Sequence, residues 1–113
     1  AEVYQRMRRC PQPIICLAHG PATGGGFAFL LASDVKIVTP DCKMNVAMVK
    51  IGLTGCDVGI SYFLPRAVGP SVAAELMMTG RFLTAERAGR LGVVSAVVPW
   101  ESLEATGRGF AED

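Results

Sequence analysis

Three consecutive glycines, Gly24 to Gly26, form the segment of this chain most suited to chemistry. They directly precede an apolar segment from Phe27 to Ser33 that has the composition of a buried helix. Glycine at the start of such a helix lets a ligand or another backbone segment approach within contact distance. The free N–H groups and the positive end of the helix dipole favour a developing negative charge there. The pattern predicts either an oxyanion hole for a carbonyl or thioester, or tight packing of a helix against a strand.

Asp57 is the second candidate, in the sequence Gly-Cys-Asp-Val-Gly. Its apolar neighbours favour the protonated form of a carboxyl group, whereas a helix start favours the charged form. A carboxyl group in this setting can transfer protons. It can equally serve as a plain helix N-cap. Both interpretations of Asp57 follow from the local sequence.

The sequence lacks the residues that several other kinds of catalytic or binding site require. The single histidine, His19, lies three residues after Cys16 and hence on the opposite face of a predicted strand, which excludes a Cys–His pair. No serine has the Gly-x-Ser-x-Gly setting of a nucleophile, and Phe27 occupies the lysine position of a phosphate loop. With one histidine and scattered carboxylates we expect no metal site. His19 is predicted to be a structural residue held by a hydrogen bond.

The elements around these residues alternate between strand and helix, which predicts an α/β fold with parallel pairing. Asp57, Ser71 and Thr84 are suited to cap three of the helices, and Pro65 is expected to kink or shorten the first of these three. The run before His19 is too continuously apolar for a strand exposed on one face. We expect strands at 13–19, 35–39, 43–47 and 93–98, and helices at 1–10, 27–33, 58–67, 72–78 and 85–91.

Composition sets further limits. The 113 residues fit a single domain; 50% are hydrophobic, 19% are charged, and the formal net charge is +1. This balance argues against nucleic-acid or membrane-surface binding, and the apolar run from Phe27 to Ala32 is too short to span a bilayer. The four cysteines lack CxxC spacing and have apolar neighbours, as buried thiols in a reducing compartment do, so we expect a cytoplasmic protein. The apolar excess suggests faces that contact further segments or subunits.

Several motifs, in order, resemble the crotonase superfamily of enoyl-CoA hydratases and isomerases. The first runs Pro-Ile-Ile-Cys-Leu-Ala-His-Gly-Pro-Ala-Thr-Gly-Gly-Gly-Phe over 13–27 and is followed by Ala-Ser-Asp at 32–34. Further matches are Leu-Pro-Arg-Ala-Val-Gly at 64–69, Leu-Met-Met-Thr-Gly at 76–80 and Ala-Glu-Arg-Ala-Gly-Arg-Leu-Gly-Val-Val at 85–94. The resemblance implies that residues 1–113 are the central part of one domain, a crotonase-like ββα spiral incomplete at both ends.

The resemblance also implies a function. The family binds acyl-CoA thioesters and polarises the thioester carbonyl with two backbone N–H groups, so that an enolate-like anion can form. The resemblance places the second of these N–H donors on Gly25 and puts Gly26 next to the substrate. It implies that the first N–H donor comes from a segment upstream of residue 1. No separate cofactor is implied, since coenzyme A is part of the substrate. The full-length protein is expected to be a homotrimer or a hexamer.

The departures from the family pattern concern proton transfer. The two glutamate positions of enoyl-CoA hydratases are Ala28 and Met48 here, and neither side chain ionises. The sequence around Asp57 resembles the aspartate segment of a dienoyl-CoA isomerase branch, with one extra residue. An acyl-CoA enzyme that depends on Asp57 is therefore the leading hypothesis. A non-catalytic acyl-CoA-binding paralogue and an inactive truncated fragment are the alternatives.

Overall fold

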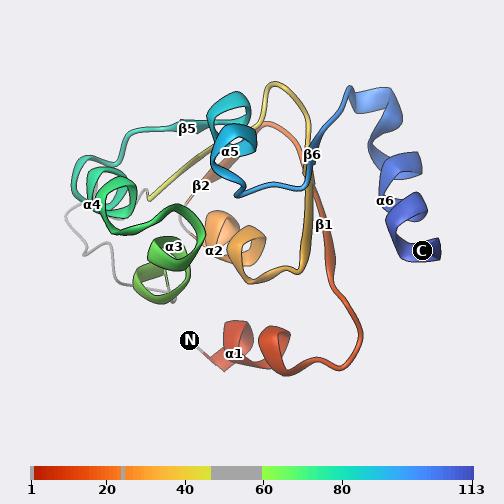
Figure 1. Ribbon diagram of the computed structural model, residues 1–113, viewed down its shortest axis with the longest axis horizontal. Helices are drawn as coiled ribbons and strands as arrows, with labels where there is room; N and C mark the ends of the chain where they lie inside the picture. Colours follow the sequence, from red (N-terminus) through yellow and green to blue (C-terminus); the bar gives the residue numbers. More distant parts are fainter. Residues whose placement is uncertain (1, 24, 47–59) are drawn as a thin grey trace.

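The computed structural model describes residues 2–23, 25–46 and 60–113, arranged as Figure 1 shows. Two small sheets and several short helices surround the central helix α2. In chain order the elements are α1 (Glu2–Arg9), β1 (Ile15–Ala18), β2 (Pro21–Thr23), α2 (Gly25–Ala32), β3 (Val35–Val38), β4 (Lys43–Asn45), α3 (Ile60–Val68), α4 (Pro70–Thr79), β5 (Leu83–Thr84), α5 (Ala85–Leu91), β6 (Ala96–Val97), the 3₁₀ helix η3 (Trp100–Ser102) and α6 (Leu103–Glu112).

The strands form two three-stranded sheets, with the orders β1-β3-β6 and β2-β4-β5. The pairings β1–β3, β3–β6 and β2–β4 are parallel, which confirms the α/β prediction, and β5 runs antiparallel to β4. Gly20 leads from the first sheet to the second with φ +61°, a left-handed conformation that costs glycine little. The chain therefore changes sheets just before the segment that leads to Gly25.

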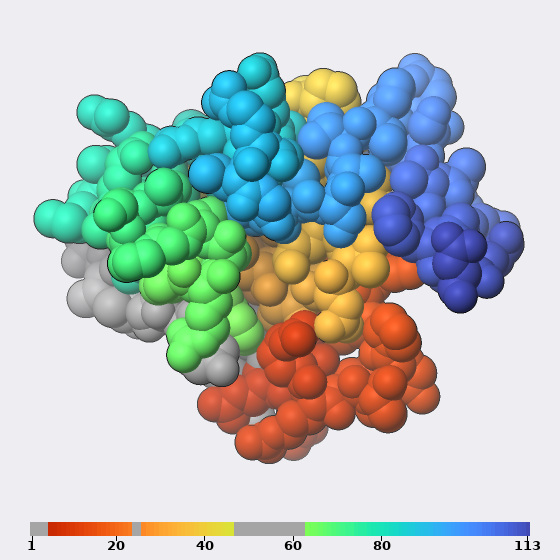
Figure 2. Space-filling model, viewed as in Figure 1, coloured from red at the N-terminus to blue at the C-terminus, as the bar shows by residue number. Residues whose placement is uncertain are grey.

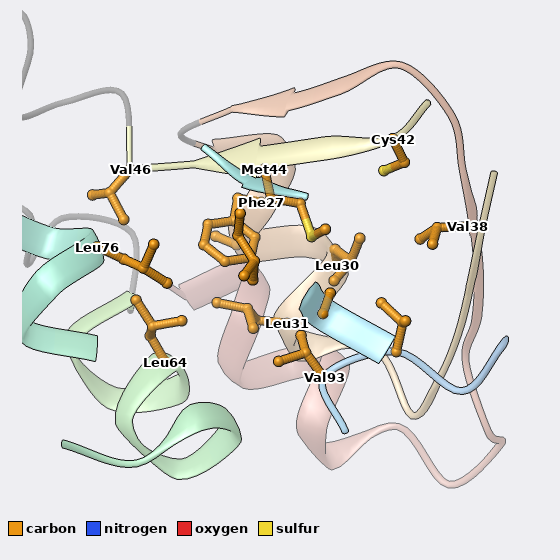
Figure 3. Packing of buried hydrophobic residues seen from close by; sticks show 14 of the residues in the cluster. Phe27, Leu30, Leu31, Val38, Cys42, Met44, Val46, Leu64, Leu76 and Val93 are labelled. Atoms are coloured by element: carbon orange, nitrogen blue, oxygen red, sulfur yellow. The ribbon is translucent and has the colours of Figure 1, made fainter. Parts of the chain in front are cut away.

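Helix α2 lies at the centre of the hydrophobic core (Figure 3). Phe27, Ala28 and Leu30 are completely or almost completely buried. Among the large side chains of this helix, only that of Phe29 is exposed. Burial of each large apolar side chain contributes roughly 1.5–3 kcal/mol, so α2 is held in place by its core contacts. The labelled side chains around it come from both sheets, from α3 and α4, and from the segment after α5: Val38, Cys42, Met44, Val46, Leu64, Leu76 and Val93.

The predicted cap of α5 is confirmed. The Thr84 hydroxyl accepts the backbone N–H of Arg87 at 3.2 Å, and Gly92 ends the helix in a left-handed conformation with φ +78°. Both signals are local, since the cap satisfies an orphan N–H and the glycine tolerates positive φ.

The predicted cap at Ser71 is wrong. Helix α4 begins at Pro70, and its N-cap residue Gly69 makes no side-chain capping bond. Proline is already fixed near the helical φ and has no N–H to satisfy, so it suits the first helical position better than a serine cap placed one residue later. Helix α3 contains Pro65 and continues to Val68, so this proline does not end it.

Strand β1 differs from the prediction of cover on both faces, because Leu17 is 40% exposed. Its side chain faces α6 at Gly107, which offers no side chain to cover it: a Cβ at Gly107 would lie 2.8 Å from the Leu17 Cδ2. The strand expected at 93–98 is also shorter, since only Ala96 and Val97 pair with β3. The close approach of α6 to β1 thus depends on a glycine.

We expect Gly109→Ala and Gly107→Ala to differ in stability, although both replace glycine in α6. Alanine at 109 meets open space and gains about 0.5 kcal/mol of helix propensity. At 107 the new methyl group would lie 2.8 Å from the Leu17 Cδ2, so this partly exposed side chain must shift and part of the gain is lost. Urea unfolding of the two full-length variants measures the difference. Equal stabilities would show that α6 does not approach β1 this closely.

Candidate functional site

The start of α2 is the candidate site. Strand β2 ends at Thr23, and α2 begins at Gly25 with no acidic residue in its first turn. The first N–H groups of a helix have no acceptor within the helix, and they carry the positive end of its dipole. Gly26 is exposed, and among the described residues no heavy atom outside its own helix backbone and chain neighbours lies within 4 Å of where its Cβ would be. The helix start can therefore accept a negatively charged oxygen at close range.

Ala28, in the same first turn, is fully buried in the core. It stands at the first glutamate position implied by the resemblance, and its methyl group cannot transfer a proton. Met48, at the second position, and Asp57 both lie outside the described residues, as does Gly24. The proximity of Asp57 to Gly25 therefore stays a prediction.

Asn45 is a buried polar residue that the sequence analysis did not single out. It pairs in register with Thr23 at the end of β2, and it is only 3% exposed. Its side-chain N–H donates to the Gly80 carbonyl oxygen, at the end of α4, at 3.2 Å. The Asn45 Oδ1 has no hydrogen-bond partner among the described residues. The amide thus ties the end of β4 to α4 immediately before the segment that contains Met48 and Asp57.

His19 lies at the end of β1, where its ring meets the Trp100 ring edge-on at a centroid distance of 4.7 Å. In the part of the chain that the structure describes, this ring contact holds His19, rather than the hydrogen bond that we predicted. Nearby, the Thr39 hydroxyl donates to the Asp41 carboxylate and holds the pKa of Asp41 below its usual value. No set of three His, Cys, Asp or Glu side chains suited to a metal ion occurs among the described residues.

Asp34 follows the C-terminal end of α2, away from the candidate site. Its carboxylate accepts the backbone N–H of Ile14 at 2.8 Å and an Arg8 guanidinium N–H at 2.8 Å. These contacts, the Ile14 bond above all, hold the pKa of Asp34 below its usual value. Arg8 also donates to the Ala32 carbonyl oxygen at 3.1 Å, so that it joins α1 to the end of α2.

We expect Asp34→Asn to destabilise the full-length protein at pH 7 and to matter less at pH 3. A carboxylate whose pKa is lowered by folding stabilises the fold above its unfolded pKa, and this contribution is lost as the pH falls through the folded value. Because both ion-pair partners are partly exposed, the loss at pH 7 is about 1 kcal/mol. Urea unfolding at the two pH values measures it, with Glu86→Gln in an exposed pair as control. An equal loss of stability at both pH values would show that the charged Asp34 carboxylate does not contribute in this way.

The profile of the family described as "Enoyl-CoA hydratase/isomerase" matches residues 1–113, the whole chain. The chain belongs to the enoyl-CoA hydratase/isomerase family. A probable enoyl-CoA hydratase of Mycobacterium tuberculosis H37Rv is 44% identical over 102 residues, which are 90% of this chain and 36% of that protein. The fatty acid oxidation complex subunit alpha of Vibrio vulnificus is 34% identical over 113 residues, covering 98% of this chain and 16% of the relative.

Solved structures give the same family and its fold. A probable enoyl-CoA hydratase/isomerase from Mycobacterium abscessus superimposes with a TM-score of 0.94 at 41% identity, covering 98% of this chain and 43% of that one. An enoyl-CoA hydratase/isomerase from Cupriavidus metallidurans CH34 superimposes with a TM-score of 0.91 at 41% identity, covering 98% of this chain and 42% of that one. The chain therefore has the crotonase-like α/β fold, incomplete relative to these family members, and spans well under half the length of each.

Two further predictions can be compared with this enoyl-CoA hydratase/isomerase structure. The three described cysteines, Cys10, Cys16 and Cys42, are free thiols, as expected. Only Cys42 is buried, whereas Cys16 is half-buried and Cys10 is exposed, so the prediction of a buried thiol is wrong for Cys10. Burial raises the pKa of Cys42 to about 11, which keeps that thiol protonated and inert. Among the described helices, none has the length and apolarity needed to cross a membrane.

Proposed function

We propose that the full-length protein transforms CoA thioesters of unsaturated acids, with the Gly25 N–H as one donor to the thioester oxygen. The observation that carries this proposal is the beginning of a buried, apolar helix at Gly25 in a chain of the enoyl-CoA hydratase/isomerase family. A preorganised N–H at this point stabilises the negative charge that develops on the oxygen when an enolate forms. Gly26 has no side chain, and none of the described residues outside its own helix and chain neighbours lies within 4 Å of its Cβ position, which supports room for the thioester there. A second donor comes from a segment upstream of residue 1.

Asp57 is the proposed proton-transfer group. For double-bond migration its carboxylate takes a proton from the carbon next to the thioester carbonyl, and the electron pair of that C–H bond moves into the dienolate. The same proton then returns to the γ-carbon. Since Ala28 carries no carboxyl group, a second acidic residue that helps to position water is missing from this turn. We therefore propose that isomerisation proceeds more readily than hydration, without a separate cofactor.

A second candidate function is binding of acyl-CoA without catalysis, and the burial of Ala28 favours it. A paired assay of the full-length protein separates the two functions, with hydration measured on a medium-chain 2-enoyl-CoA and double-bond migration on the 3-enoyl-CoA of the same chain length. We expect migration to exceed hydration. If the protein binds an acyl-CoA and turns over none, the non-catalytic function is correct.

The assembled protein is proposed to be a cytoplasmic homotrimer or hexamer. Large apolar side chains that remain exposed support subunit contacts, above all Met78 at 78% and Trp100 at 61%. Figure 2 displays one face of the isolated chain, with α4 and α6 at its two flanks. Sedimentation of the full-length protein tests this part of the proposal, and a monomer would contradict it.

A further inference from the structure

Asn45 lies at the end of the sheet from which the chain enters the candidate site. Asn45 and Thr23 are the last residues of β4 and β2, and they are partners in this parallel pair. Gly25, the first residue of α2, follows Thr23 by two positions. The placement of Asn45 therefore affects the point where the chain leaves β2 for Gly25.

The Asn45 side chain makes a connection that the strands do not make. On β4, the described residues that pair with β5 are Lys43 and Met44, so this ladder ends before Asn45. The next link runs from the Asn45 side-chain N–H to the Gly80 carbonyl oxygen at 3.2 Å, three residues before β5 begins. Gly80 is buried and ends α4 in a left-handed conformation with φ +66°. The amide thus holds the end of β4 at a defined point of α4.

Packing alone does not account for an amide at this position. The neighbours of Asn45 along β4, Met44 and Val46, are fully buried in the hydrophobic core (Figure 3). Asn45 is itself 3% exposed, and its Oδ1 has no hydrogen-bond partner among the described residues. A buried oxygen without a partner lowers stability relative to an apolar side chain of the same size. Asn45 therefore contributes through its bond to Gly80 rather than through burial.

The orientation of the Gly25 N–H depends on the chain that precedes it. This N–H belongs to the planar peptide unit that joins residues 24 and 25. The core contacts of α2, at Phe27 and Leu30, begin beyond this peptide unit. With glycine at both 24 and 25, no side chain restricts how the unit is turned. Its orientation is therefore controlled by the direction in which the chain leaves β2, and β2 is held by β4.

We propose that Asn45 is a positioning residue for the thioester reaction. Its bond to Gly80 fixes the end of β4, β4 fixes the end of β2, and the Gly25 N–H is thereby directed at the thioester oxygen. Asn45 does not touch the substrate. The inference rests on the proposed function of Gly25 as a donor to that oxygen. Because this donor acts most strongly on the charge that develops in the transition state, its misalignment affects kcat more than KM.

Asn45→Leu in the full-length protein tests the inference, since leucine has a similar size and no N–H to donate. A displacement of a reacting group by ~1 Å can lower a rate ~10²-fold, so we expect kcat to fall by about ten-fold or more and KM to change by less than about two-fold. Arg87→Met is the matched control, because it removes two bonds of 3.0 Å that tie Glu75 of α4 to α5 instead of β4. This control should retain the parental kcat.

A spectroscopic measurement separates positioning from a merely structural role. The probe is cinnamoyl-CoA at saturating concentration, whose conjugated thioester absorbs at longer wavelength when an N–H donor polarises its carbonyl group. We expect the red shift in the parent and in Arg87→Met, and a smaller shift in Asn45→Leu although the probe is bound. A merely structural Asn45 would lower the melting temperature and leave the shift of the folded protein unchanged. Asn45→Ala, which also lacks the donor, is the second variant if Asn45→Leu does not fold.

Gly25→Pro distinguishes failure of this inference from failure of the proposed function. Absence of the shift in the parent, or an unchanged shift in folded Gly25→Pro, would contradict the role of Gly25 and the inference with it. A shift that is present in the parent and lost in Gly25→Pro, yet unchanged in a folded Asn45 variant, would overturn the positioning role alone. An equal fall of kcat in Arg87→Met and Asn45→Leu would also overturn it.

Discussion

Asp57→Asn is expected to lower turnover of the full-length protein by roughly 10²–10⁴-fold, the usual contribution of a general acid–base. Ala28 and Met48 cannot ionise, and Asp57 is the only acidic residue between Asp41 and Glu75. Asparagine has nearly the same size as aspartate and caps helices about as well, so the substitution removes proton transfer and leaves a capping role intact. Acyl-CoA binding and the melting temperature should therefore stay close to those of the parent. Turnover of enoyl-CoA isomerisation, compared with a binding titration of the same thioester, measures the effect.

Asp41→Asn is the matched control for this variant. Asp41 is a carboxylate of the same chain whose hydrogen-bond donor, the Thr39 hydroxyl, can also donate to an asparagine oxygen. We expect this variant to retain parental turnover. Full activity in Asp57→Asn would mean that Asp57 is only a helix cap, and that the catalytic group comes from another segment of the protein.

The parts of the fold that the sequence predicts well have local causes. Helix α5 has its N-cap at Thr84 and ends at Gly92, and the seven residues of the helix lie between these two positions. The cap and the terminating glycine both act through adjacent backbone groups. The central helix is evident because every residue from Phe27 to Ala32 is apolar. Parallel pairing follows from the alternation of strands and helices rather than from any single residue.

The missed elements depend on contacts between distant residues. Strand β2 has only three residues and begins with Pro21, and it exists because it pairs with β4, about twenty residues later. Helix α6 contains Gly107 and Gly109, which lower its intrinsic propensity, yet it packs on β1 and β3 at the other end of the chain. Tertiary contacts therefore override local preference in both elements.

The candidate site divides in the same way. The helix start at Gly25 is predictable, because three glycines before an apolar run are a local pattern. Asn45 is not predictable, since its role arises from a bond to Gly80 across 35 residues. The Arg8–Asp34 ion pair is equally hidden, because its two residues meet only when α1 packs beside the end of α2. Sites built from one segment can be found from sequence, whereas those assembled from several need the fold.

Gly25→Pro is expected to lower turnover by about 10²–10³-fold, the usual cost of removing one oxyanion-hole donor. Gly25 is the first residue of α2, where proline is tolerated because its φ is already helical and the missing N–H has no partner within the helix. The substitution therefore removes the donor while α2 can still form. Gly25→Ala keeps the N–H, so the difference in kcat/KM between the two variants isolates the donor. Circular dichroism and melting curves establish that both are folded, and equal turnover in two folded variants would remove Gly25 from the oxyanion hole.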